Sequence, residues 1–315
     1  MNYEVRIRNI RVLMITGDRR IFESGTEANA RFTLQQSAVE ELKAVFWGKG
    51  ALIRPLFTKG KFDVVTSQDP FWRGLVAWFL ARRLGARLNI QVHTDFEAET
   101  RAKPIRHILG QIVLRHADSV RVVSEKIKKQ VVRIGVHASI STLPIFIDVP
   151  KFHSVRLRSH AGKNILWIGR FEDEKNPREA IEILKEVRKK IPDASLIMLG
   201  EGSWYQRLSD LARNLPIIVP QGWQNPLIHL DTADVLLSTS KHESWGAVFV
   251  EALAAGIPVV APDVGIASIA GNVRVVPHKE LAKTVVDVLL NPFPGELTLK
   301  LLDREEWAVA WKETL

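Results

Sequence analysis

Two cations and two carboxylates in the second half of the chain are the side chains whose types and spacing could do chemistry. Arg170 and Lys175 follow a short apolar run and a glycine, and Glu243 and Glu251 lie eight residues apart on either side of a Gly-Ala pair. Arginine binds a diphosphate bidentately and lysine binds it as a point charge, whereas carboxylates accept hydrogen bonds from sugar hydroxyls. The four residues together predict a nucleotide-sugar site, although each alone could be a solvated surface residue.

The two glutamates are positioned by a predicted strand–loop–helix–strand unit. Residues 234–239 and 257–261 are short apolar runs typical of parallel strands buried on both faces, and residues 246–255 form a good helix sequence. Loops at the carboxyl ends of parallel strands are where α/β sheets bind ligands. The free N–H groups of a helix N-terminus suit a phosphate, and small residues allow it to approach closely. The positions concerned are Trp245, Gly246, Ala247 and Val248.

This stretch resembles the donor-binding signature of the retaining glycosyltransferases of family 4, which share the two-domain GT-B fold. The resemblance implies that Glu243 contacts the transferred sugar and that Glu251 contacts the nucleotide ribose. In that family, Gly-Arg-Leu followed by Lys-Gly supplies two cations that neutralise the leaving diphosphate. The matching residues here are Gly169-Arg170-Phe171 and Lys175-Asn176. The resemblance covers nearly the whole chain and is most specific in residues 164–265.

Five further residues match places where the family binds its ligands, and each also has a structural explanation. Gly200 lies in a loop beside the donor, where a tight turn alone would require glycine. Gly222 and Trp223 lie where the family holds the nucleotide base, and Trp223 either stacks on that base or packs in the core. His93 matches the histidine near the transferred sugar's reaction centre, although a lone histidine is usually structural. Gly25 matches the acceptor domain's glycine-rich loop, and loop and cap chemistry alone would explain it.

The order of predicted elements indicates an α/β protein, and the resemblance implies two doubly wound, Rossmann-like domains facing across a cleft, the GT-B arrangement. The length of 315 residues suits two domains of ordinary size. Residues 1–147 are expected to form the acceptor-side domain and residues 148–315 the donor domain. The last helix, residues 303–315, is expected to pack back on the first domain. A capped helix is expected from Thr26 to about Leu42, and a linker is expected to run to about Gly162.

The composition is that of a soluble globular protein. No apolar run approaches the ~20 residues of a membrane span, and the first residues do not resemble a signal peptide. The absence of cysteine excludes disulfides and thiolate metal sites. We expect a cytoplasmic protein.

The positive charge is concentrated in the first half of the chain. Residues 1–150 carry 24 Lys and Arg against 14 Asp and Glu, whereas residues 151–315 carry 20 against 21. A basic half attracts an anionic partner, or it is only a solvated surface. The predicted helix over residues 71–84 combines aromatics with arginines, so it either suits a membrane interface or buries its aromatics in the core. Peripheral contact with an anionic membrane, on its inner face, is therefore an expectation, whereas nucleic acid is not an expected partner.

The resemblance implies a retaining glycosyltransferase of hexosyltransferase type that acts in cell-envelope glycan biosynthesis. It would move a sugar from a UDP-, GDP- or ADP-sugar to a hydroxyl of an unknown acceptor, a glycan or a lipid-linked glycan. Arg170, Lys175 and helix amides are expected to take the place of a metal, since no Asp-x-Asp pair is present, and His93 is expected to orient the sugar. No tightly bound cofactor is expected. The alternatives are a nucleotide-sugar epimerase or hydrolase of the same fold and a non-catalytic, basic α/β binding protein.

Overall fold

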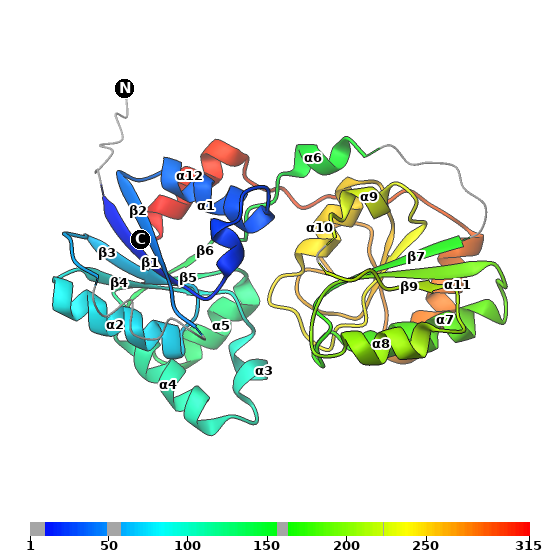
Figure 1. Cartoon of the computed structure of the whole chain (residues 1–315), viewed down its shortest axis with the longest axis horizontal. Coiled ribbons are helices and arrows are strands. Elements are labelled where there is room, and N and C mark those ends of the chain that lie inside the picture. The colour runs from blue at the N-terminus through cyan, green and yellow to red at the C-terminus, as the bar shows by residue number, and fades with distance from the viewer. Residues whose placement is uncertain (1–9, 49–57, 156–162, 223) are drawn as a thin grey trace. The chain divides into compact units, whose positions relative to one another are not determined.

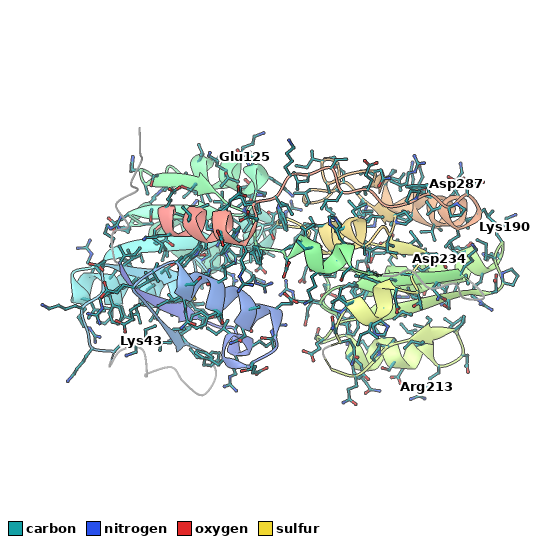
Figure 2. The ribbon with its side chains drawn as sticks, turned by 90° about the horizontal axis from the view of Figure 1, so that it is seen from above. Lys43, Glu125, Lys190, Arg213, Asp234 and Asp287 are labelled. Carbon is teal, nitrogen blue, oxygen red and sulfur yellow. The ribbon has the colours of Figure 1, made fainter. Side chains whose placement is uncertain are left out.

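The computed structural model forms two compact units (Figure 1). The first unit is Met1–Phe146 with Leu302–Leu315, and the second is Ile147–Leu301. The structure describes residues 10–48, 58–155, 163–222 and 224–315. Each unit holds one parallel sheet with helices packed against it, which confirms the prediction of two Rossmann-like α/β units. Charged side chains such as Lys43, Arg213 and Asp287 are exposed on the outside of the units (Figure 2).

The first unit is built on a six-stranded parallel sheet with the strand order β2-β1-β3-β4-β5-β6. β1 lies inside the sheet because its apolar residues are buried on both faces, with Val12 opposite both Leu42 and Val64. The strands are β1 (Arg11–Thr16), β2 (Glu41–Phe46), β3 (Val64–Ser67), β4 (Arg87–Val92), β5 (Ser119–Val122) and β6 (Ser139–Thr142). The helices are η1 (Arg19–Phe22), α1 (Glu27–Ser37), α2 (Trp72–Leu84), α3 (Phe96–Thr100), α4 (Pro104–Arg115), α5 (Glu125–Arg133) and α12 (Arg304–Glu313).

The second unit is built on a six-stranded parallel sheet with the order β12-β11-β10-β7-β8-β9. Its core is apolar and includes Trp167, Phe171 and Met198, with α7 and α11 packed on it. The strands are β7 (Lys163–Ile168), β8 (Ala194–Leu199), β9 (Ile217–Ile218), β10 (Val235–Leu237), β11 (Val259–Ala261) and β12 (Arg274–Val275). The helices are α6 (Val149–His153), α7 (Pro177–Arg188), α8 (Tyr205–Ala212), α9 (Leu227–Leu230), α10 (Ala247–Ala254), η3 (His278–Glu280) and α11 (Leu281–Leu290).

The last helix, α12, belongs to the first unit, where Figure 1 shows it in red beside α1. Asp303 and Glu306 form a reciprocal capping box at its start. Trp307 and Trp311 are buried on its inner face, and the indole Nε1 of Trp307 donates to the Pro144 carbonyl at 2.9 Å. The chain therefore returns to the first unit after completing the second.

One sequence-based expectation about an element is wrong. The helix from Thr26 does not reach Leu42: α1 ends at Ser37, and Glu41–Phe46 is instead an edge strand paired with β1. The basic helix α4 starts at Pro104, because proline favours the first turn of a helix. The expected linker, which runs to about Gly162, begins with a short helix, α6, whose Phe152 is buried; residues 156–162 lie outside the part of the chain that the structure describes.

Candidate functional site

Lys175 and Glu243 lie in two loops of the second unit that leave neighbouring strands. β7 and β10 pair in parallel, so their carboxyl ends open on the same edge of the sheet. The Nζ of Lys175 forms an ion pair with Oε1 of Glu243, and both side chains are largely buried. The hydroxyl of Ser240 donates to the same carboxylate oxygen at 2.9 Å. The fold thus joins two predicted site residues that are 68 positions apart.

The buried hydroxyl of Thr239 fixes the loop that carries Lys175. It accepts a hydrogen bond from the indole Nε1 of Trp167 at 2.9 Å, and it lies 2.9 Å from the carbonyl oxygens of both Lys175 and Asn176. Asn176 has a φ of 49°, in the left-handed region that glycine and asparagine tolerate best. The family typically has glycine after this lysine, and asparagine serves the same turn here.

The side chain of Arg170, in the same loop, is exposed to solvent. Its guanidinium pairs with Oε1 of Glu174 at 2.6 Å and is mostly exposed. The carbonyl of Glu174 accepts from the backbone N–H of Lys241 at 2.8 Å, which ties this loop to the one that carries Glu243. Arg170 is therefore accessible to a ligand, and its ion-pair partner is Glu174 rather than Glu243.

The loops after β7 and β8 pack closely against each other, and glycines make this close backbone approach possible. A Cβ atom at Gly200 would overlap the carbonyl oxygen of Gly169, and one at Gly202 would lie 2.5 Å from the carbonyl oxygen of Phe171. Backbone hydrogen bonds join the same segments, with Gly169 N–H donating to Leu199 at 3.0 Å. The structure therefore brings two predicted donor-site glycines, Gly169 and Gly200, together.

Gly222 and Trp223 were the residues predicted near the nucleotide base. Gly222 has a φ of 76° and lies close to the side chain of Glu201, which belongs to the loop after β8. Trp223 lies outside the residues that the structure describes.

The start of α10 has the features of an anion site. Gly246 precedes the helix with a φ of 99° and supplies no side-chain cap, so the first N–H groups, at Ala247 and Val248, have no side-chain acceptor from that position. Glu251 lies one turn further along the helix and is half-buried. The indole of Trp245, which directly precedes Gly246, is buried, with 2% of the residue exposed.

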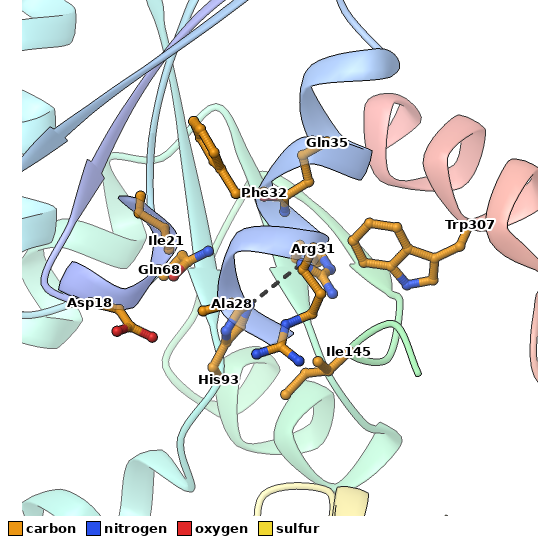
Figure 3. Close-up of a pocket in the computed structure, with 11 residues that line it drawn as sticks. Asp18, Ile21, Ala28, Arg31, Phe32, Gln35, Gln68, His93, Ile145 and Trp307 are labelled. Atoms are coloured by element: carbon orange, nitrogen blue, oxygen red, sulfur yellow. Dashed lines mark hydrogen bonds between the residues drawn. The ribbon is translucent and has the colours of Figure 1, made fainter. Parts of the chain in front are cut away.

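His93, in the first unit, lines a cavity of about 140 Å³ (Figure 3). Its Nε2 lies 3.4 Å from Nη1 of Arg121, a buried side chain that comes from β5. The guanidinium of Arg121 also donates to the Oε1 of Gln91 at 2.7 Å and to the carbonyls of Leu143 and Pro144 at 3.0 and 2.8 Å. The cavity is lined by Asp18, Ile21, Ala28, Arg31, Phe32, Gln35, Gln68, His93, Arg121, Ile145 and Trp307.

The charge states in this cavity follow from burial. Burial lowers the pKa of Arg121 to about 9, which leaves it a cation at neutral pH. Burial, followed by the positive charges of Arg121 and Arg31, holds the pKa of His93 well below its ordinary value. His93 is therefore neutral. Because its Nε2 faces an arginine donor, that nitrogen is the acceptor and Nδ1 carries the proton.

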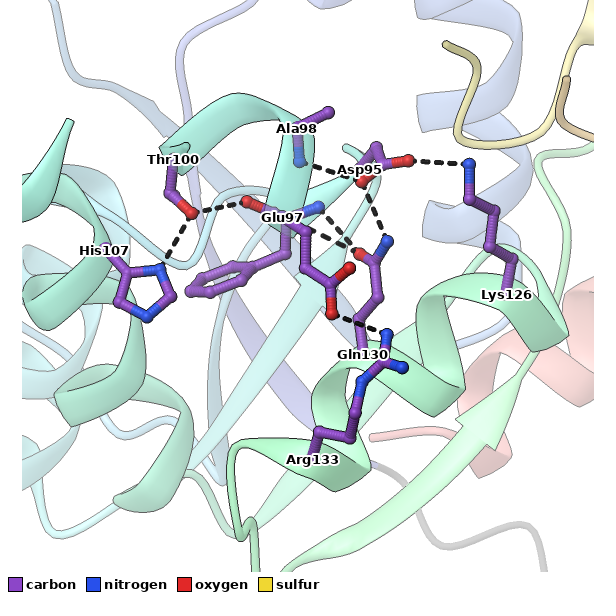
Figure 4. A network of polar contacts seen from close by, with 9 residues as sticks. Asp95, Glu97, Ala98, Thr100, His107, Lys126, Gln130 and Arg133 are labelled. Carbon is purple, nitrogen blue, oxygen red and sulfur yellow. Dashed lines mark hydrogen bonds and ion pairs between the residues drawn. The ribbon is translucent and has the colours of Figure 1, made fainter. Parts of the chain in front are cut away.

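A polar network holds the loop that follows His93 (Figure 4). Asp95 accepts from the backbone N–H of Ala98 at 3.1 Å and from the side-chain amide of Gln130 at 2.8 Å. Gln130 in turn accepts from the backbone N–H of Phe96 at 3.0 Å, and Lys126 pairs with Asp95 at 2.9 Å. This network attaches α3 to α5 and fixes the end of β4, where His93 lies.

Two family models together match most of the chain. The model described as "Glycosyl transferase 4-like domain" matches residues 17–145, and the model described as "Glycosyl transferases group 1" matches residues 148–291. The chain belongs to the GT-B glycosyltransferases. Within that group it resembles family 4.

Relatives and solved structures agree with this membership. The GT-B chain is 25% identical over 229 residues to alpha-monoglucosyldiacylglycerol synthase of Streptococcus pneumoniae, covering 64% of this chain and 52% of the relative. It is 26% identical over 254 residues to sulfoquinovosyl transferase SQD2 of Arabidopsis thaliana, covering 74% and 47%. It therefore spans about half the length of these two relatives. HepE of Anabaena, solved in complex with UDP-glucose, shares the fold with a TM-score of 0.70 at 16% identity, covering 96% of this chain and 94% of that one.

Gly25 lies apart from the cavity in the first unit of this GT-B chain. It has a φ of 86° and precedes Thr26, whose hydroxyl caps α1 by accepting from the N–H of Asn29 at 3.1 Å. Ala28, rather than Gly25, is among the residues that line the cavity. The turn before α1, with its positive φ, is therefore enough to explain the glycine at position 25.

Sequence reasoning missed the residues that hold the predicted site residues in place. Thr239 and Ser240 fix the lysine and the first glutamate, Arg121 contacts His93, and Gln91 accepts a hydrogen bond from Arg121. One signal was present in the sequence, because each of these polar residues lies within or directly after an apolar strand, where it must find a hydrogen-bond partner.

Proposed function

We propose that this GT-B chain is a metal-independent glycosyltransferase of hexosyltransferase type that transfers a sugar from a nucleotide-diphosphate donor with retention at the anomeric carbon. One observation supports this most strongly. The Lys175–Glu243 ion pair, the exposed Arg170 and the uncapped start of α10 all follow strands of one parallel sheet, in the part that matches the group 1 family model. Cations and helix amides suit a diphosphate, and a carboxylate suits sugar hydroxyls.

The chemistry proposed for this site is a same-face displacement. The bond between the sugar's anomeric carbon and the β-phosphate oxygen breaks, and its electron pair leaves with the diphosphate. The acceptor's hydroxyl oxygen bonds to the anomeric carbon on the same face, and its proton passes to a phosphate oxygen. Arg170, Lys175 and the N–H groups of Ala247 and Val248 stabilise the charge that develops on the leaving group.

The two glutamates have different surroundings, and this supports different roles. Glu243 is held between Lys175 and Ser240, so its carboxylate is oriented before any ligand arrives. In this proposal Glu243 accepts hydrogen bonds from the transferred sugar, and Glu251, further along α10, accepts them from the ribose. UDP-, GDP- and ADP-sugars all remain candidate donors. HepE, which shares the fold, was solved with UDP-glucose.

The cavity around His93 is proposed to hold the reacting end of the acceptor. Neutral His93 offers an Nδ1–H donor that can orient a sugar or hydroxyl group, and Arg121 fixes its ring. The acceptor is proposed to be a glycan or a lipid-linked glycan, and the S. pneumoniae relative is by name a glycolipid synthase. A cytoplasmic location, a role in cell-envelope glycan biosynthesis and contact with the inner membrane face complete the proposal.

A thermal-shift screen of UDP, GDP, ADP and their sugars tests the donor assignment. A nucleotide at 100 times its dissociation constant adds about 2.7 kcal/mol to the free energy of unfolding. Stabilisation by one nucleotide family is expected, with transfer that survives a chelator. A protein that no nucleotide stabilises, or whose activity is lost on chelation and restored by a divalent ion, would contradict the proposal. Consumption of donor without acceptor would indicate an epimerase or hydrolase instead.

Variants at the two cations test the chemistry. Arg170→Ala and Lys175→Ala should each lower turnover more than they weaken binding of a nucleoside monophosphate, because their charge is needed where the leaving diphosphate develops its own. Lys185→Ala is a matched control, since Lys185 is an exposed lysine of α7 paired with Glu182 at 3.1 Å. Near-normal turnover in both test variants would refute the assignment.

A further inference from the structure

The outward faces of α2 and α4 carry large apolar side chains where a surface helix normally carries polar ones. Trp72 and Phe79 are exposed on α2, and Ile105, Ile108 and Ile112 are exposed on α4. The spacings of seven within α2 and of three and four within α4 place each set on one stripe of its helix. We name these five residues the α2–α4 face.

The two helices that carry the stripes pack against each other. A Cβ atom at Gly74 of α2 would lie 2.8 Å from a methyl carbon of Val113 in α4, and the rings of Trp78 and His116 are 4.3 Å apart between centroids. Figure 1 shows the two helices side by side on the same side of the first unit's sheet. The two exposed stripes are therefore carried by neighbouring helices on one side of the sheet.

Cations lie at the end of α2 and just before α4, and the two helices contribute no carboxylate of their own to this face. Neither helix contains Asp or Glu. Exposed Arg82 and Arg83 close the last turn of α2, and exposed Arg101 and Lys103 lie just before α4. Arg101 makes no hydrogen bond or ion pair within the residues that the structure describes. Within the described residues, two carboxylates pair with these helices and the residues before α4: Asp69 lies 2.7 Å from Arg73 of α2, and Glu99 lies 3.8 Å from Lys103 and 3.5 Å from Arg106.

We propose that the α2–α4 face docks on the surface of an anionic lipid bilayer. Apolar side chains with tryptophan and phenylalanine can enter the region between head groups and acyl chains, while the arginines and lysines near the helix ends contact the anionic head groups. No helix among the described residues is long and apolar enough to cross a membrane, so the contact would be peripheral. A second copy of the chain fits this face less well, because self-association would bring like charges together.

The proposal does not depend on the proposed transfer reaction, because none of the five residues lines the His93 cavity or lies in the second unit. Its test is therefore a binding experiment. Flotation uses vesicles of equal parts phosphatidylglycerol and phosphatidylcholine, and vesicles of phosphatidylcholine alone. Each is run at about 0.1 M and about 1 M salt, where the Debye length falls from about 10 Å to about 3 Å.

The protein should float with anionic vesicles at low salt, more weakly at high salt, and hardly at all with neutral vesicles. Ile105→Asn with Ile108→Asn should lower the partition coefficient about 100-fold, because two isoleucines 73% and 55% exposed lose their apolar contact with the lipid. The matched control is Ile228→Asn in α9, because Ile228 is 64% exposed and lies in the second unit. This control should float like the unaltered protein.

A second pair of variants tests the charges. Arg101→Gln with Lys103→Gln should lower partitioning about 30-fold, at about fivefold for each cation. Lys189→Gln with Lys190→Gln is the control, since Lys189 is likewise paired with a glutamate and Lys190 lies beside it at the end of α7 (Figure 2). Equal flotation of both double variants would refute the role given to this face.

Fluorescence of the unaltered protein adds a measurement that no folding defect can disturb. Lipids brominated along the acyl chain should quench the tryptophan emission on binding, and Trp72→Phe should remove most of that quenching while still binding. Absence of flotation with anionic vesicles, or equal flotation with neutral ones, would overturn the proposal. So would a dimer in light scattering that Ile105→Asn with Ile108→Asn abolishes, or salt-sensitive binding to nucleic acid in place of vesicles.

Discussion

Replacing Thr239 by valine removes one hydroxyl at the point where the second unit positions its lysine. The side chains have nearly the same shape, so the change deletes hydrogen bonds with little change in packing. The lost hydroxyl accepts from the indole of Trp167 and contacts the carbonyls of Lys175 and Asn176, all at 2.9 Å. Thr239 and Trp167 are buried, so water cannot replace what is lost.

The size of the effect follows from these contacts. An indole N–H left buried without an acceptor costs about 1–3 kcal/mol, and the lost bond to the loop carbonyls adds about 1 kcal/mol. We expect Thr239→Val to lower the free energy of unfolding of the second unit by about 3 kcal/mol. At roughly 2–4 °C per kcal/mol for a unit of this size, its Tm should fall by about 6–12 °C. Turnover should fall as well, because the loop that carries Lys175 loses its attachment.

Thr239→Ser separates the hydroxyl from the methyl group. Serine keeps the hydrogen bonds and loses one buried methyl, which costs about 1 kcal/mol. Calorimetry of the purified protein should therefore rank the unaltered chain above serine and serine above valine. If valine were as stable as serine or more so, the hydroxyl would not hold the loop, and the account of how Lys175 is positioned would be wrong.

Three further predictions concern the predicted site residues. Glu251→Gln should weaken nucleoside diphosphate binding in calorimetry, whereas Glu243→Gln should spare it and impair sugar transfer; equal effects would contradict the division of roles. Gly200→Ala should lower both Tm and nucleotide affinity, because its Cβ would overlap the Gly169 carbonyl, and unchanged affinity would show that this loop contact is irrelevant to the donor. The pKa of His93 is held well below its ordinary value, so only the unfolded chain takes up this proton below about pH 6.5, and stability falls as the pH drops, by up to about 1.4 kcal/mol per pH unit. Urea unfolding of His93→Gln should show a shallower loss between about pH 6.5 and 5, and an identical slope would contradict the neutral histidine.

Elements with strong local signals were predictable from the sequence. β8, Ala194–Leu199, is apolar at every position except Ser195, and Ser124 caps α5 as its hydroxyl and the following glutamate indicate. β2 was not predictable in this way. Its sequence Glu-Leu-Lys-Ala-Val-Phe fits a helix as well as a strand, and only its pairing with β1, about thirty residues away, makes it a strand.

The same division holds for the candidate site. Residue types and spacing were enough to propose Lys175 and Glu243, but their contact depends on β7 lying beside β10, which no local pattern specifies. Arg121 is a second example, because an arginine in a buried strand has no local explanation until Gln91 and the Pro144 carbonyl are found around it. The roles of these residues in transfer stay predictions until the variants are measured.

The return of α12 to the first unit has a consequence for protein synthesis. The sheet amide of Asn89 donates to the Thr314 carbonyl at 2.7 Å, and the Ser119 hydroxyl donates to Leu315 at 3.2 Å. These partners leave the ribosome only after the 155 residues of Ile147–Leu301. At 5–20 residues per second that interval is roughly 8–30 s. During this interval the apolar surface that Trp307 and Trp311 later cover stays exposed on the nascent first unit. The second unit is continuous in the chain, so it is the first of the two units whose residues are all synthesised.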